Sequence, residues 1–235
     1  MLFTGLQTKK GPAPIVVAAP HDGDDTDGFS DGNSGLIAAR LAAKLGARLV
    51  LARNLRRLVD VNKDPESISN PRLAAWCHRY QQHIFRPLPL LVLEIHGHIS
   101  GNFDLEISTG YQFIDTPFRR RLELYRQDLQ QAIDKIWRPG GPLKDVKKPT
   151  LGVFPLDQDV KLKATRTYTF RLVRALRLLG YPCYGLHVEI ARYLRLVPPE
   201  GLAIHAAVVA ILSTGLKHFI PRLSIINRNR FTMTK

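Results

Sequence analysis

Short apolar runs alternate with longer stretches of helical periodicity along this chain, which is the pattern of a sheet whose strands are joined by helices. The apolar runs predict strands, at residues 14–19, 48–52, 89–96, 103–109, 151–154 and 184–190. The periodic stretches predict helices, at residues 36–45, 71–85, 117–137, 166–179 and 199–218. This order predicts an α/β fold with a mixed or mainly parallel sheet flanked by helices.

Local signals mark the ends and faces of the predicted helices. Asn33 or Ser34 can cap the helix at 36–45, and Gly46 can end it. Apolar positions of the helix at 166–179 should face inward, namely Leu172, Val173, Leu176 and Leu179. Arginines should lie along its outer arc, namely Arg171, Arg174 and Arg177.

The length of 235 residues suits one domain, and the apolar content of 45% argues against wholesale disorder. We expect a single α/β domain over residues 12–218 and a basic, aperiodic tail over residues 219–235. The two cysteines, Cys77 and Cys183, indicate neither a disulfide framework nor a cysteine-rich zinc site. The start of the chain lacks the apolar core of a signal peptide, and the apolar stretch at 202–216 is too short to cross a bilayer. We therefore expect a cytoplasmic protein without a membrane partner.

The net charge of +14 is distributed unevenly. Residues 160–195 carry eight Lys or Arg against Glu189 alone, and residues 201–235 carry five and no acid. Such charge attracts an acidic partner, such as an anionic substrate or nucleic acid, but it can equally serve only solubility. The basic stretches lack interleaved aromatic residues and any nucleic-acid-binding motif, so nucleic acid is not the favoured partner.

Histidines follow two of the predicted buried strands. His21 comes just after the first, and His96 and His98 end the third on the same face as Glu94. Because ligands bind outside the carboxyl ends of strands in open α/β sheets, we expect these side chains near one site. Two histidines, one carboxylate and an open position form a usual catalytic zinc site, which makes water a nucleophile near neutral pH. The loop after His21 offers several carboxylates, namely Asp24, Asp25, Asp27 and Asp31.

Other polar residues are candidates for catalysis and substrate binding. Glu189 could be the general base that takes a proton from water and gives it to a leaving amine, or it could merely pair with Arg192 or Arg195. Arg56 could hold a carboxylate or an oxyanion, and Asn62 could orient an amide. Alternatively, Arg56 and Asn62 have no role in a site and belong to a short edge strand that enters a polar turn.

Six short motifs follow one another along the chain. They are Pro20-His21, Asp25-Thr26-Asp27, Leu45-Gly46-Ala47, Arg56 with Val59-Asp60-Val61-Asn62, Ile95-His96, and Val188-Glu189-Ile190. Their order resembles the N-formylglutamate amidohydrolase family, and it is similar to the zinc carboxypeptidase and poly-γ-glutamate hydrolase group. The resemblance covers residues 14–110 and 184–195.

The resemblance implies a phosphorylase/hydrolase-like α/β domain with one zinc ion. His21 and His96 would be metal ligands, and Glu189 would be the base. The resemblance also implies that Arg56 and Asn62 contact the substrate. We further expect Lys63, His98 and Arg192 to bind it.

The third metal ligand differs among the proteins that the chain resembles. Alignment to the formylglutamate enzymes points to Asp25 or Asp27, and alignment to the polyglutamate hydrolases points to Asp31. The carboxypeptidases have a spacing of three residues between the first histidine and the carboxylate ligand, and this points to Asp24. We rank Asp24 and Asp31 first.

These features together predict a zinc-dependent hydrolase of an amide (C–N) bond in a small acidic substrate, such as an N-acylated or γ-linked glutamate. The chain departs from the family where Gly28 replaces a Trp and Lys63 replaces an Arg, which weakens a bidentate grip on a carboxylate. A second hypothesis is therefore a non-catalytic binding module on the same fold, which holds nucleic acid or an acidic partner through its basic surface.

Overall fold

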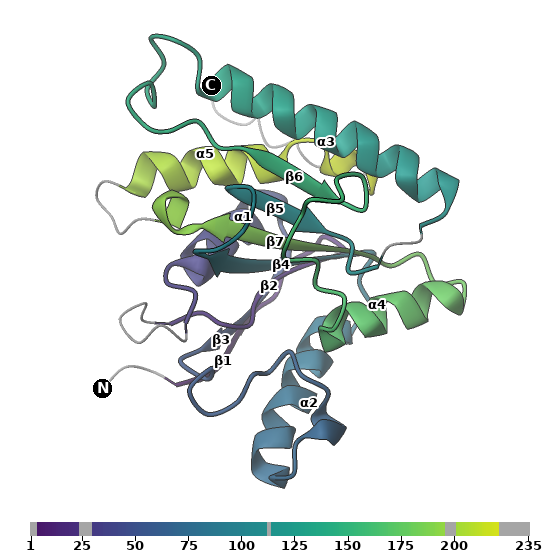
Figure 1. Cartoon of the computed structure of the whole chain (residues 1–235). Coiled ribbons are helices and arrows are strands. Elements are labelled where there is room, and N and C mark those ends of the chain that lie inside the picture. The colour runs from purple at the N-terminus through teal and green to yellow at the C-terminus, as the bar shows by residue number, and fades with distance from the viewer. Residues whose placement is uncertain (1–3, 24–29, 112–113, 196–200, 221–235) are drawn as a thin grey trace, which may run out of the picture.

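The described strands form one seven-stranded sheet in the order β1–β3–β2–β4–β7–β5–β6 (Figure 1). The computed structural model describes residues 4–23, 30–111, 114–195 and 201–220. The strands are β1 (Gly5–Lys9), β2 (Ile15–Ala19), β3 (Arg48–Arg53), β4 (Leu91–His98), β5 (Leu105–Ser108), β6 (Leu151–Phe154) and β7 (Tyr184–Ala191). The neighbouring strands β3, β2, β4 and β7 are parallel to one another. The strand β1 pairs antiparallel with β3, and β5 pairs antiparallel with β7. The predicted α/β class with a mixed sheet is confirmed.

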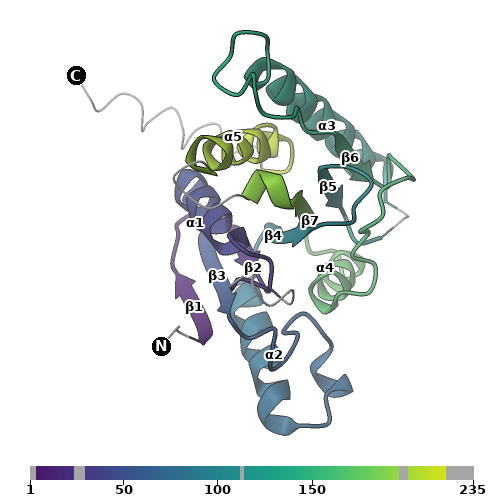
Figure 2. The same ribbon diagram turned by 60° about the vertical axis from the view of Figure 1, so that its left-hand side comes forward.

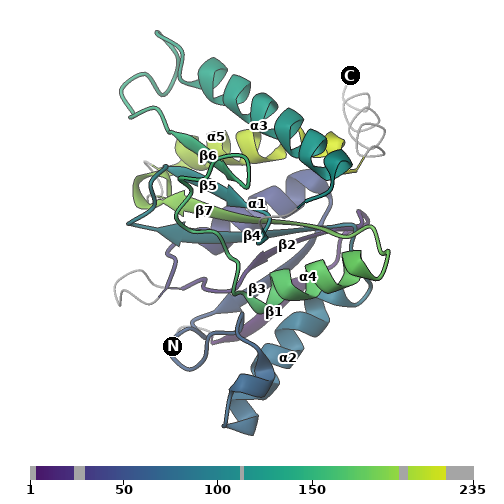
Figure 3. The same ribbon diagram turned by 45° about the vertical axis from the view of Figure 1, so that its right-hand side comes forward.

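Helices cover both faces of this sheet. On one face lie α1 (Ser34–Leu45), α3 (Thr116–Ile136) and α5 (Gly201–Ser213), and on the other lie α2 (Pro71–Phe85) and α4 (Tyr168–Leu178) (Figure 1, Figure 3). The short 3₁₀ helices of the described residues are η2 (Pro65–Ser67), η3 (Arg192–Arg195) and η4 (Leu216–His218). Side chains alternate across each strand, so Ile15 and Val17 pack under the first group of helices and Val16 and Ala18 under the second.

The apolar helix α5 is part of the core. With η4 it makes a span, Gly201–His218, that is long and apolar enough to cross a bilayer by length and composition alone, which corrects the expectation that this stretch is too short. Of this span 56% is buried, and α5 packs against α1 and α3 (Figure 2). Such burial is what the core helix of a folded domain shows.

Two local features differ from the predicted pattern. The polar strand β1 was not predicted, and it joins the sheet edge beside β3 ahead of the expected domain start at residue 12. Leu179 is 83% exposed, so the expectation that it faces inward is wrong. The cause is that α4 ends at Leu178 and Gly180 turns the chain with φ 82°, while Phe170 and Val173 supply the buried face.

The order of the strands creates a switch point between β2 and β4. The chain passes from β2 to β3 on one side and later returns to place β4 on the other side. In open α/β sheets, ligands bind outside the carboxyl ends of the strands at such a point. His21 follows β2 and His96 lies near the end of β4, so the fold brings both histidines to this position.

Candidate metal centre

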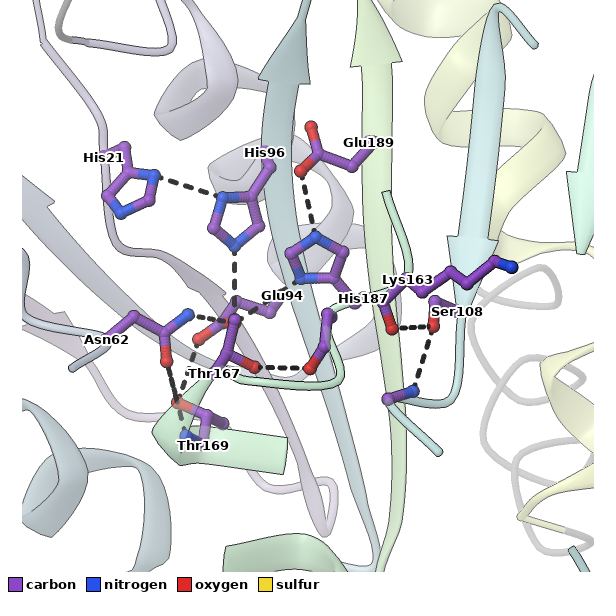
Figure 4. A network of polar contacts seen from close by, with 12 residues as sticks. His21, Asn62, Glu94, His96, Ser108, Lys163, Thr167, Thr169, His187 and Glu189 are labelled. Atoms are coloured by element: carbon purple, nitrogen blue, oxygen red, sulfur yellow. Dashed lines mark hydrogen bonds and ion pairs between the residues drawn. The ribbon is translucent and has the colours of Figure 1, made fainter. Parts of the chain in front are cut away.

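Two histidines and one aspartate meet at the switch point. His21 Nδ1 and His96 Nδ1 face each other at 3.2 Å (Figure 4). Asp31 Oδ2 lies 3.4 Å from each of these nitrogens. Two expected histidine ligands and one of the candidate carboxylates, Asp31, are thus in contact. The remaining loop candidates lie outside the described residues, and they are Asp24, Asp25 and Asp27.

The triangle formed by these three atoms has the size of a zinc site. Bonds of about 2.0–2.1 Å in a tetrahedral arrangement place neighbouring ligand atoms about 3.3–3.4 Å apart. The three atoms here are separated by 3.2, 3.4 and 3.4 Å. Imidazole nitrogen and carboxylate oxygen are also donors that zinc accepts. His21, Asp31 and His96 therefore fit one zinc ion, and a set of three protein ligands leaves one position open.

The loop that carries Asp31 is held on both sides. The backbone N of Asp31 donates to the His21 carbonyl at 2.8 Å. Asn33 adopts φ 63°, a left-handed conformation that asparagine tolerates better than most residues, and its Nδ2 donates to the Arg195 carbonyl at 2.8 Å. The buried Arg195 guanidinium donates in turn to the carbonyl of Gly32. These bonds fix the backbone on both sides of the carboxylate.

The second nitrogen of each histidine faces a carboxylate of its own. His21 Nε2 lies 2.9 Å from Asp60 Oδ1, and His96 Nε2 lies 3.3 Å from Glu94 Oε2. An ionised carboxylate can only accept a hydrogen bond, so each Nε2 carries the hydrogen and each Nδ1 keeps its lone pair for a metal. Carboxylates in this position orient metal-binding histidines and raise their basicity.

Arg56 lies against the pair formed by His21 and Asp60. Its Nη1 is 2.5 Å from Asp60 Oδ2 and also contacts His21 Nε2. A guanidinium can only donate, so Asp60 is its acceptor. Burial alone would raise the pKa of Asp60, but His21 and Arg56 hold it at about 2. The carboxylate is therefore ionised, and it orients both the His21 ring and the Arg56 guanidinium.

Glu94 is fully buried between the sheet and the helices α2 and α4. Asn62 Nδ2 donates to its Oε2 at 2.6 Å, and the Tyr80 hydroxyl donates to its Oε1 at 3.0 Å. Thr169 joins the network by donating its hydroxyl to Asn62 Oδ1 at 2.8 Å (Figure 4). The Asn62 amide, expected at the substrate, thus bonds to other protein groups, and its contact with substrate stays a prediction.

The electrostatics of the ligand set favour a cation. Burial alone would raise the pKa of Asp31, but His21 and His96 hold it well below its usual range. Burial alone would lower the pKa of His96, but Asp31 and Glu94 raise it to about 10. In the metal-free protein His96 is therefore protonated, and its additional proton lies where the three side chains converge.

Glu189 lies beside this set, at the end of β7. Its Oε1 accepts from His187 Nε2 at 2.9 Å, and its Oε2 is buried without a hydrogen-bond partner in the described part of the chain. The register of β4 and β7 pairs Glu189 with His96 and His187 with Glu94. Neighbouring parallel strands therefore place the expected base next to an expected ligand.

A cavity of about 560 Å³ opens in front of these groups. The expected base Glu189 lines it, and so do three residues expected at the substrate, Arg56, Asn62 and Lys63. The lining does not include His98 or Arg192. His98 Nδ1 instead accepts from Gly101 N at 3.0 Å, and Arg192 is an exposed residue of η3.

The loop 161–167 forms a further wall of the cavity, and the sequence alone did not suggest it. It contributes Lys161, Lys163 and Arg166 to the lining. The buried Glu106 of β5 holds the start of this loop, since its Oε2 accepts from Leu162 N at 2.8 Å. The only signal was the excess of basic residues after position 160, which did not indicate where they lie.

No family model and no curated protein matches the sequence significantly. Among solved structures, a gene product of Agrobacterium tumefaciens matches with 15% identity and a TM-score of 0.52 over 95% of both chains. N-formylglutamate amidohydrolase from Ralstonia eutropha matches with 13% identity and a TM-score of 0.49, over 97% of this chain and 100% of that one. A bacteriophage poly-γ-glutamate hydrolase matches with 14% identity and a TM-score of 0.44, over 90% of this chain and 89% of that one.

At these identities the comparison bears on the fold alone. The Agrobacterium structure has a TM-score above 0.5 and agrees with the α/β architecture described above. Proteins of the kind that the sequence motifs resemble are among the structural matches.

Proposed function

We propose that this protein is a zinc-dependent hydrolase of an amide (C–N) bond in a small acidic substrate, such as an N-acylated or γ-linked glutamate. The observation that carries the proposal is the triangle of His21 Nδ1, His96 Nδ1 and Asp31 Oδ2, with Glu189 beside it and a cavity in front. The names of the structural matches agree with this class of reaction but do not carry the argument.

The residues of the cavity have separate roles in this proposal. A bound zinc ion would polarise the amide carbonyl and lower the pKa of water. Glu189 takes a proton from the attacking water and passes it to the departing nitrogen. Arg56, which keeps Asp60 as one partner and lines the cavity, holds a substrate carboxylate or the oxygen that becomes negative.

The charge of the cavity supports an acidic substrate. Its lining carries five basic residues, Arg56, Lys63, Lys161, Lys163 and Arg166, against three carboxylates. Two of these carboxylates are already engaged, Asp31 with the histidines and Asp60 with Arg56. The surplus of positive charge attracts anions into the cavity.

The non-catalytic binding module remains the alternative, but the structure lends its basic helix little support. Arg171 of α4 forms an ion pair with Asp64 at 3.0 Å, and Arg177 pairs with Asp115 and stacks on Phe118. These arginines have intramolecular partners, so they are poorly placed to hold nucleic acid. A nucleic-acid complex whose affinity falls steeply with salt, with no hydrolysis of any amide, would favour the alternative.

The test combines metal content with turnover of N-formylglutamate and γ-glutamyl amides. Glu189→Gln should keep its zinc but lose activity by about 100-fold or more, because it removes the base and not a ligand. Glu123→Gln on α3, a surface carboxylate that pairs with Arg120, is the matched control and should keep both. If the zinc-loaded wild type hydrolyses none of these amides, or if Glu189→Gln is as active as the control, the proposal is wrong.

A further inference from the structure

His187 is a buried histidine next to the proposed base, and the reaction described above gives it no role. It is 4% exposed and lies two residues before Glu189 on β7, so both side chains point to the same face of the sheet. Its ring packs against that of His96, with centroids 4.2 Å apart and planes inclined by 37°, and it meets Phe170 edge-on at 5.6 Å. The ring therefore has little freedom to turn.

One hydrogen bond connects His187 to the base. Its Nε2 is 2.9 Å from Glu189 Oε1, and because an ionised carboxylate can only accept, the hydrogen lies on Nε2. Its Nδ1 is buried and has no hydrogen-bond partner in the described part of the chain. The closest acidic oxygen, Glu94 Oε2, is 3.7 Å away, beyond hydrogen-bonding distance.

A different role for His187 would be to bind metal together with Glu94 and His96, whose ligand atoms also cluster. The hydrogen bonds of Glu94 argue against a metal site at these three residues. Its Oε2 already accepts from Asn62 at 2.6 Å and faces His96 Nε2 at 3.3 Å, and its Oε1 accepts from Tyr80 at 3.0 Å. A carboxylate with this many partners has little capacity left for a cation.

We propose that His187 is a positioning residue for Glu189, an inference that rests on the proposed hydrolase function. The Nε2–H group of His187 holds Oε1 and leaves Oε2 to exchange the proton. As the water oxygen adds to the amide carbon, Oε2 takes its proton; when the C–N bond breaks, the same proton goes to the departing nitrogen and the carboxylate is regenerated. Since the terminal torsion of a glutamate is broad, an unheld carboxylate would spend much of its time misaligned.

The experiment compares three variants of the zinc-loaded full-length protein. His187→Phe keeps a ring without a donor, His187→Gln places an amide N–H near the position of Nε2, and His83→Phe changes an exposed histidine of α2 as a control. We expect His187→Phe to lower kcat by about 10- to 100-fold with little change in KM, as for loss of an orienting partner. His187→Gln should recover most of kcat, and all three variants should keep the zinc content of the wild type.

Nitrogen-15 NMR of the wild-type imidazoles provides a readout that needs neither substrate nor a folded variant. We expect His187 as the Nε2–H tautomer, donating to Glu189. The Nδ1–H tautomer, loss of zinc in His187→Phe, or a His187→Gln protein as slow as His187→Phe would each overturn the proposal. If the wild type hydrolyses no amide, the proposed function fails, while the tautomer still decides whether His187 holds Glu189.

Discussion

At the scale of single residues, Glu94 is the group whose position most needs an explanation. A carboxylate without solvent exposure is tolerated only where donors surround it, and Glu94 has Asn62, Tyr80 and His96 around it. Burial, and then the nearby Glu94, raise the pKa of Tyr80 well above its usual value, so its hydroxyl remains a donor. This arrangement makes sense if Glu94 orients His96.

The network around Glu94 predicts a stability effect. Tyr80→Phe removes one donor from a buried carboxylate and should lower the free energy of unfolding by about 1–3 kcal/mol. Tyr181→Phe is the control, because the hydroxyl of this partly buried residue makes no hydrogen bond to another described residue, and it should change stability by about 0.5 kcal/mol or less. Urea denaturation of the metal-free proteins measures both. Equal effects of the two substitutions would show that the bond to Glu94 contributes nothing.

The raised pKa of His96 predicts how metal binding depends on pH. Below its pKa of about 10 the metal-free protein holds a proton on His96, which a metal must displace. Affinity for zinc should therefore rise by roughly tenfold per pH unit through the neutral range and level off above that pKa. Calorimetry in buffers of different ionisation enthalpy should show about one proton released per ion at pH 8. Binding without proton release would contradict the assignment of His96 as a ligand.

At the scale of elements, the ends of β2, β4 and β7 build the site, and Glu106 of β5 holds the loop that closes it. Glu106 accepts from Leu162 N at 2.8 Å and from Asn102 N at 2.6 Å, and so ties two loops together. Glu106→Gln replaces an acceptor oxygen with a donor and should speed hydrogen exchange at Leu162 by about fivefold, since the lost hydrogen bond is worth about 1 kcal/mol. KM should rise while zinc content stays constant. Unchanged exchange at Leu162 would mean that Glu106 does not anchor the loop.

The elements also show what the sequence could predict. The buried strand β2 is a continuous apolar run, and β4 and β7 begin with apolar residues before polar ones alternate with them, so the polar residues toward the strand ends are visible in the sequence. The edge strand β1 has no such run, because only one side of it is paired. The contribution of loop 161–167 to the cavity depends on the path of the chain between β6 and α4, which local patterns do not encode. The pairing of His187 with Glu189 is implied by their spacing, but their distance from His96 follows only from the register of β4 and β7.

At the scale of the whole molecule, metal binding should stabilise the fold, because its ligands come from segments far apart in the sequence. Zinc at about 100 times its dissociation constant should add about 2.7 kcal/mol, which corresponds to a rise in Tm of roughly 5–10 °C for a domain of this size. His21→Ala should abolish this rise, and the exposed His83→Ala should not. Scanning calorimetry with and without zinc measures the shift. A rise of the same size in His21→Ala would place the metal elsewhere.

The central claim is that His21, Asp31 and His96 hold one zinc ion at the switch point of the sheet. Anomalous diffraction at the zinc edge, from crystals of the zinc-loaded protein, tests it most directly. The account predicts a single strong peak at about 2.0–2.1 Å from His21 Nδ1, His96 Nδ1 and Asp31 Oδ2. A peak among Glu94, His96 and His187 instead, or no peak near His21, would contradict it.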